Sequence, residues 1–101
     1  MKDIKEYILE NNNTQDEDLQ DEVGLALKEF GSVRNGFKPT TLDKIEDKMY
    51  YLEFDYDESS SDDEKLVFVG NYIDTEYEVD LYIDKKQGNN ITLKSFNVFQ
   101  V

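Results

Sequence analysis

Residues 76–93, EYEVDLYIDKKQGNNITL, decide the fold that we expect for this chain. Apolar and polar side chains alternate through the first nine of them, a period of two that is typical of a half-buried β-strand. Residues 85–90 then include Gly and Asn, which tolerate positive φ angles and reverse the chain. The alternation resumes at Ile91 and Leu93. We therefore predict a β-hairpin with one apolar face and one acidic face.

The hairpin extends into further strands on both sides. The later apolar residues Phe96 and Val98 fall in the opposite phase, which a β-bulge near Ser95 would reconcile. Residues 66–73 form a preceding strand that is apolar on both faces and is therefore central or covered on both sides. Gly70 within it marks a bulge or a close approach of another backbone.

An earlier strand is predicted over residues 49–56, where apolar and polar positions alternate again. This alternation puts Tyr50 in the core and Tyr51 on the polar face. Residues 57–64, DESSSDDE, have no apolar side chain and five acidic ones, so they predict a solvated loop between two strands.

Helical spacing dominates the first third of the chain. Residues 3–10 predict a short helix. Thr14 and Glu17 have the spacing of a capping box, which predicts a second helix that continues to Phe30 and ends before Gly31. The apolar stripe of this second helix consists of Leu19, Val23, Ala26, Leu27 and Phe30.

Residues 32–48 contain few apolar side chains together with Gly36 and Pro39, so we interpret them as a connector. Leu42 and Ile45 fit either a helical turn or a short irregular strand. Helices followed by antiparallel strands indicate an α+β fold: two N-terminal helices packed on a curved antiparallel sheet of about four strands. The length fits a single domain over residues 1–101.

The composition excludes much familiar chemistry. The chain has neither Cys nor His, which removes disulfides, thiolate nucleophiles, Cys/His zinc sites and catalytic triads. With 24 Asp and Glu against 11 Lys and Arg, the formal net charge is −13, which disfavours direct contact with nucleic acid or anionic membranes. No leader-like segment or apolar run of membrane-spanning length is visible, so we expect a cytoplasmic location.

Two chemical alternatives receive little support from the residues. Asp55, Asp57 and Ser59 match the first three ligand positions of an EF-hand loop, but Ser60 and Leu66 stand where that loop needs Gly and Glu. Asp80 paired with Glu78 or Glu53 would resemble a glycosidase pair, yet a general acid needs burial that an exposed sheet face does not give. We expect no enzymatic activity, metal or cofactor.

The strongest candidate site is the acidic face of the predicted sheet. Its members are Tyr51, Glu53, Asp55, Glu76, Glu78, Asp80, Tyr82 and Asp84. Carboxylates accept hydrogen bonds from Arg, and tyrosines provide anchoring area, so this face suits a basic protein partner. An ordinary wet face would mix in cations for cross-strand pairing, and this one has almost none.

These observations favour a non-enzymatic acidic protein that neutralises a basic partner, either a toxin or a nucleic-acid-handling protein. The composition and predicted surface are similar to those of small acidic immunity proteins that neutralise bacterial nuclease toxins, and of phage-encoded nucleic-acid mimics. One alternative is a structural or oligomerising module that uses a sheet edge or the apolar strand of residues 66–73. Another is a small-ligand binder with a pocket between Phe30, Tyr50, Phe54 and Phe68.

Overall fold

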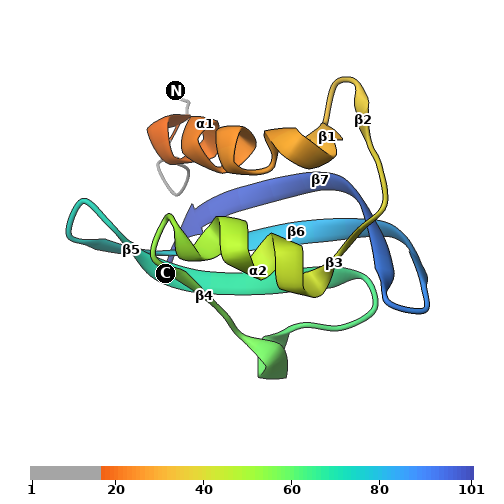
Figure 1. The fold of residues 1–101 in the computed structure, drawn as a ribbon. Coiled ribbons are helices and arrows are strands. Elements are labelled where there is room, and N and C mark those ends of the chain that lie inside the picture. Colours follow the sequence, from red (N-terminus) through yellow and green to blue (C-terminus); the bar gives the residue numbers. More distant parts are fainter. Residues whose placement is uncertain (1–16) are drawn as a thin grey trace, which may run out of the picture.

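The computed structural model describes residues 17–101 as an α+β fold in which helices lie on one face of an antiparallel sheet (Figure 1). The five-stranded sheet has the order β3-β7-β6-β5-β4, and every neighbouring pair is antiparallel. Its strands are β3 (Thr40–Thr41), β4 (Phe54–Tyr56), β5 (Lys65–Tyr72), β6 (Thr75–Gln87) and β7 (Asn90–Gln100). The α+β class and the antiparallel sheet are confirmed, but the sheet has five strands because β3 adds an edge that the sequence pattern did not reveal.

The predicted hairpin over residues 76–93 is confirmed as β6 and β7. Gly88 occupies the turn with a φ angle of 60°, a conformation that glycine adopts without steric cost. The predicted irregularity near Ser95 is also present, because the register with β6 shifts between the pairs Tyr82–Ser95 and Ile83–Leu93. The two phases of β7 therefore both point their apolar side chains toward the helices.

The hairpin between β5 and β6 turns through Ile73 and Asp74, whose φ angles are 48° and 62°. Ile73 was expected to continue the strand, but the chain reverses there instead. A β-branched residue rarely adopts a positive φ, and the side chain of Ile73 is exposed at the tip of the hairpin.

The second predicted helix is present within the described residues as α1 (Glu17–Ala26), followed by the short 3₁₀ helix η1 (Lys28–Phe30) and the small hairpin β1–β2 (Gly31–Ser32 and Gly36–Phe37). Its predicted stripe points into the core: Leu19, Val23, Leu27 and Phe30 are buried. The helix predicted over residues 3–10, and the capping residue Thr14, lie outside the described residues.

The strand predicted over residues 49–56 is wrong in its first half, where helix α2 (Leu42–Tyr50) stands instead. Thr41 caps this helix by accepting a hydrogen bond from the Lys44 backbone N–H, and Ile45 and Met49 are buried four residues apart on one face. Only α1 therefore precedes the five-stranded sheet, because α2 follows its strand β3. Because Tyr50 ends the helix on its outer side, it is 71% exposed rather than buried.

The core lies between α1, η1 and α2 on one side and the helix-facing side of the sheet on the other (Figure 1). Its sheet residues are Phe54, Leu66, Phe68, Tyr77, Val79, Leu81, Ile83, Ile91, Leu93 and Val98. Gly70 is confirmed as a close-approach position, because an added Cβ would lie 2.5 Å from the Glu53 backbone oxygen. None of the described helices is long and apolar enough to cross a membrane.

Candidate partner-binding surface

The side of the sheet turned away from the helices, called the outer face below, carries most of the predicted acidic site. Cross-strand pairing places its residues in rows: Asp55, Val69, Glu78 and Phe99 form one row, and Val67, Asp80 and Asn97 form the next. Lys65 and Tyr82 pair at one end of the face, and Asn71 and Glu76 pair at the other. Residues opposite each other in an antiparallel sheet share a face, so these side chains are neighbours.

Asp80 stands at the centre of the outer face and is only 2% exposed. The sequence pattern predicted an exposed carboxylate here, and that expectation is wrong. The directly paired residue Val67 is also buried, while Lys65, Glu78 and Tyr82 around them are partly exposed. Longer side chains at neighbouring positions thus keep water from the middle of the face.

Lys65 is the cation of this cluster, and its Nζ lies 3.2 Å from Asp80 Oδ2. The hydrogen bond and charge of Asp80 raise the pKa of Lys65, so the lysine stays protonated. The pairing is a diagonal one between adjacent strands, since Lys65 itself lies opposite Tyr82. While Glu78 is ionised, Asp80 Oδ1 has no hydrogen-bond donor among residues 17–101.

Glu78 points to the same face two residues before Asp80, and its pKa is raised to about 7. The main cause is a hydrogen bond with the Asp80 carboxyl, followed by burial and by the negative charge of Asp80. Lys65 opposes this rise only partly. Two carboxyl groups this close do not both ionise readily, so Glu78 carries its proton for a substantial fraction of the time near neutral pH.

The loop that follows β4 is hydrogen-bonded to β5 at the edge of the outer face. Asp57 accepts hydrogen bonds from the hydroxyls of Ser59 and Ser60, both at 2.8 Å, which lower its pKa and keep it ionised. The Ser61 hydroxyl bridges to β5 by donating to the Asp57 carbonyl and accepting from the Val67 backbone N–H. The predicted solvated loop therefore includes an ordered turn, the 3₁₀ helix η2 (Glu58–Ser60).

The structure brings together five of the predicted site residues and separates three. Asp55, Glu76, Glu78, Asp80 and Tyr82 share the outer face. Tyr51 caps the end of α2 and Glu53 stands in the following turn with a φ of 65°, so neither lies on a strand. Asp84 is exposed at the second register shift of β6, between Ile83 and Lys85.

Sequence reasoning missed Lys65 and Phe99 as members of this face. Both follow from the register of β5, β6 and β7, which depends on where each hairpin turns. A turn at Ile73 and Asp74 carries no Gly or Asn signal, so the pairing of Lys65 with Tyr82 had no visible marker.

The outer face combines carboxylates with apolar area and can hold cationic groups. In this cluster the four carboxylates of Asp55, Glu76, Glu78 and Asp80 outnumber the single ammonium group of Lys65, and the half-buried Val69 and Phe99 supply apolar area beside them. Tyr82 accepts a hydrogen bond from the Asn97 amide at 3.3 Å, which fixes its ring next to Lys65. No group of three or more acidic side chains within residues 17–101 is placed to hold a metal ion.

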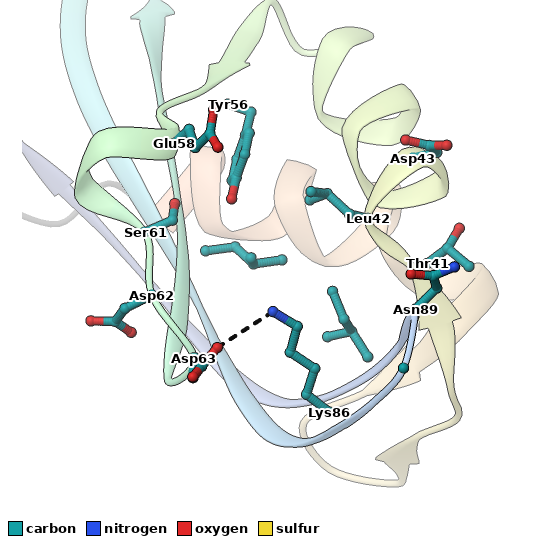
Figure 2. A pocket seen from close by; sticks show the side chains of 13 residues that line it. Thr41, Leu42, Asp43, Tyr56, Glu58, Ser61, Asp62, Asp63, Lys86 and Asn89 are labelled. Atoms are coloured by element: carbon teal, nitrogen blue, oxygen red, sulfur yellow. Dashed lines mark hydrogen bonds and ion pairs between the residues drawn. The ribbon is translucent and has the colours of Figure 1, made fainter.

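A separate pocket of about 660 Å³ opens between α2, the loop after β4 and the β6–β7 hairpin (Figure 2). Its apolar lining comes from Leu42, Tyr56, Leu66 and Ile91. Lys86 reaches across it toward Asp63, with 3.4 Å between Nζ and Oδ1, and the Tyr56 side chain points into the space (Figure 2).

This pocket is not where the sequence placed one. Phe30, Phe54 and Phe68 are buried in the core, and Tyr50 lies outside it, so these four residues enclose no cavity. The pocket forms instead because the loop of residues 57–64 stands away from the first turn of α2 (Figure 2).

Known proteins give no further guide to this surface. No protein-family model matches the chain, and neither a curated protein nor a solved structure reaches a significant match with it.

Proposed function

We propose that this protein is a non-enzymatic binding protein that neutralises a basic protein partner through the outer face of its sheet. The observation that carries the proposal is the cluster of Asp55, Glu76, Glu78 and Asp80, in which Lys65 is the one basic residue of the cross-strand pairs that join β4, β5 and β6. An acidic face speeds encounter with a basic partner and rejects anionic competitors.

The partner that fits best is a toxin or another protein that handles nucleic acid, because such proteins present basic grooves that normally receive phosphates. An immunity protein for a bacterial nuclease-type toxin, acting in the cytoplasm, would use its carboxylates in place of those phosphates. A phage-encoded inhibitor that mimics nucleic acid would use the same surface. Both versions predict a complex that weakens as salt concentration rises.

The test is co-expression with the protein encoded by the adjacent gene, followed by measurement of growth rescue and of association rate. We expect Asp55→Lys with Glu76→Lys to slow association at least tenfold, because both side chains are exposed on the outer face. The matched control is Asp18→Lys with Asp21→Lys, which makes the same charge change at exposed positions of α1.

Equal effects of the two double variants would show that net charge acts without a specific face. A complex that forms equally well in 0.05 and 0.5 M salt would contradict electrostatic recognition. Absence of any complex or rescue with that protein would contradict the proposed immunity role.

The pocket in Figure 2 favours a second candidate function, the binding of a small ligand. Its volume lies within the usual range for ligand sites, and its apolar lining next to Glu58, Asp63 and Lys86 suits a molecule with both apolar and charged parts. Titration of small alkylamines while observing the Tyr56 ring by NMR tests this. Saturable shifts of the Tyr56 ring that are weakened by Leu42→Asn on the opposite wall support the candidate, and unchanged spectra contradict it.

The oligomerising alternative would use the edge of β7. Strand β3 pairs only with Asn90 and Ile91, so residues 92–100 of β7 have no strand on that side within the described part of the chain.

A further inference from the structure

Among residues 17–101, Asp80 is the only charged residue that is buried. Its Oδ2 accepts a hydrogen bond from Lys65 Nζ, whereas its Oδ1 meets no donor in that part of the chain. A buried carboxylate oxygen without a donor costs stability, because it has lost the water that would otherwise bond to it. The outer face therefore holds an acceptor that a proton or a cationic ligand can satisfy.

A protonated Glu78 fits this requirement. A carboxylic acid donates one O–H, and Glu78 reaches Asp80 from two residues away on the same strand and face. This hydrogen bond to Asp80 is the largest cause of the raised pKa of Glu78, which is about 7. The pair therefore shares one proton and carries a single negative charge when Glu78 is protonated.

Charged groups surround the pair on three strands. The titratable neighbours from β4 and its loop, from β5 and from β6 are Asp55, Asp57, Lys65, Glu76 and Tyr82. The β7 residues directly opposite the pair are uncharged, with Asn97 opposite Asp80 and Phe99 opposite Glu78. Most of these neighbouring groups are negatively charged, so they attract a cation that approaches Glu78 and Asp80.

We propose that Glu78 and Asp80 form a seat for an arginine side chain of the basic partner, and that the shared proton leaves to solvent when the guanidinium binds. This inference rests on the proposed function and specifies which group of the basic partner binds to the outer face. The guanidinium replaces the O–H of Glu78 as a donor, and Glu78 then accepts from it as a carboxylate. One proton is released for each arginine bound.

Arginine suits this seat better than lysine. Its planar guanidinium carries five N–H donors in a fixed fork, so it bridges two carboxyl groups at once, and it keeps its charge throughout the pH range in question. Lysine offers a single ammonium group, and Lys65 already occupies that role at Oδ2. The aromatic ring of Phe99, which pairs with Glu78, gives the guanidinium plane a surface to stack on.

Proton release makes binding depend on pH in a definite direction. Below about pH 7 the partner must displace a proton from Glu78, so affinity for arginine falls by up to tenfold for each pH unit. Above pH 7 Glu78 is already ionised and affinity levels off. A surface of fixed negative charge gives no such step, because binding to it releases no proton.

The experiment uses the full chain and a hexa-arginine peptide as the probe, with a hexa-lysine peptide of equal charge for comparison. Calorimetric titrations at pH 5.5, 6.5 and 7.5, in two buffers of different ionisation enthalpy, count the protons released. We expect hexa-arginine to bind at least tenfold more tightly at pH 7.5 than at 5.5 and to release about one proton at pH 6.5. Hexa-lysine should show a smaller change.

Glu78→Gln keeps a donor toward Asp80 but has no proton to lose, so it should abolish the pH step and the proton release. Glu76→Gln makes the same charge change on the same face and should keep both. In the wild type, the ¹³C resonance of the Glu78 carboxyl should titrate at lower pH when hexa-arginine is present. This NMR readout separates loss of the seat from a change in overall charge.

Binding of hexa-arginine with the same affinity at all three pH values would overturn the arginine seat while leaving the proposed function intact. Equal effects of Glu78→Gln and Glu76→Gln would overturn it in the same way. If hexa-arginine does not bind although the basic partner protein does, the seat is also wrong. Failure of that partner protein to bind would instead contradict the proposed function.

Discussion

Glu78 shows how one side chain links the surface of this protein to its stability. Its pKa is about 7 in the folded chain against an ordinary value of 4.5, so folding favours the protonated form. That contribution is complete below about pH 4.5 and is lost as the pH rises through 7. Replacing Glu78 by Gln should remove this dependence and stabilise the protein at pH 8 by roughly 1 kcal/mol, less than the full shift because the side chain is partly solvated.

Urea unfolding at pH 5 and pH 8 measures this effect. Glu76→Gln is the matched control, because it removes one charge from an exposed position of the same strand. If both variants change the pH dependence alike, general charge repulsion rather than the Glu78–Asp80 pair is responsible.

Gly70 is fixed by a neighbouring backbone rather than by its own conformation. A methyl group there would lie 2.5 Å from the Glu53 oxygen and 2.9 Å from the Phe54 ring, so the turn and β4 would have to move. Gly70→Ala should lower the free energy of unfolding by about 2 kcal/mol. Gly24→Ala serves as the control. A Cβ added at this position of helix α1 would contact only the Phe96 side chain, at 3.9 Å, and we expect a small stabilisation. Denaturant midpoints that fall equally for both variants would contradict this account.

Asp80 shows which properties of a single residue can be predicted from the sequence and which cannot. Alternation in β6 correctly placed it on the polar face, because period two assigns a side to every residue. It could not assign depth, since burial of Asp80 depends on Lys65 and Val67 in the adjacent strand. The chemistry of the pair with Glu78 was invisible for the same reason.

At the scale of elements, the turn between β5 and β6 is built from residues that suit it poorly. Ile73 and Asp74 both have positive φ angles, for which Asn and Gly are the preferred pair. Ile73→Asn with Asp74→Gly should raise the free energy of unfolding by about 1 kcal/mol through relief of backbone strain. Thermal unfolding measures it, and Ile73→Val is the control that keeps the β-branch and should bring no gain.

A rise in stability for Ile73→Val equal to that of the double variant would show that exposed apolar area, rather than φ, is the cause. If neither variant changes the melting temperature, the turn is not strained in solution.

Helix α2 shows why one element was predicted as another. The alternation of residues 50–56 is real, and it correctly marks β4, but it begins inside a helix whose own period is set by Leu42, Ile45 and Met49. Thr41 supplies the N-cap without an acidic residue at the third helical position, so the start of α2 lacked its usual signature. By contrast, α1 and the β6–β7 hairpin carried strong local patterns and were predicted correctly in type.

At the scale of the whole molecule, the charge of −13 should make stability depend on salt. Surface pairs such as Glu29–Lys48, with 2.9 Å between their charged atoms, offset little of this repulsion because Glu29 is exposed and Lys48 is partly exposed to water. We expect the urea midpoint to rise between 0.05 and 0.5 M NaCl, as the screening length falls from above about 10 Å to below it. A falling midpoint would show that the ion pairs outweigh the repulsion.

The variant with Asp55→Lys and Glu76→Lys tests where the repulsion is concentrated. It reduces the acidic charge of the outer face, so its urea midpoint should respond less to salt than that of the wild type. The same charge change on α1, Asp18→Lys with Asp21→Lys, should reduce the response less if the outer face dominates. An equal reduction would indicate charge spread evenly over the molecule.

The order of elements along the chain has a consequence for how the protein is made. Leu19 and Val23 of α1 are synthesised early, but the core they enter is completed by Val98 on β7. During translation the helices therefore emerge from the ribosome with their apolar faces uncovered. These faces stay exposed until nearly the whole of this chain has left the exit tunnel. Only then can the sheet close beneath them, so a nascent chain truncated before residue 90 should remain accessible to chaperones.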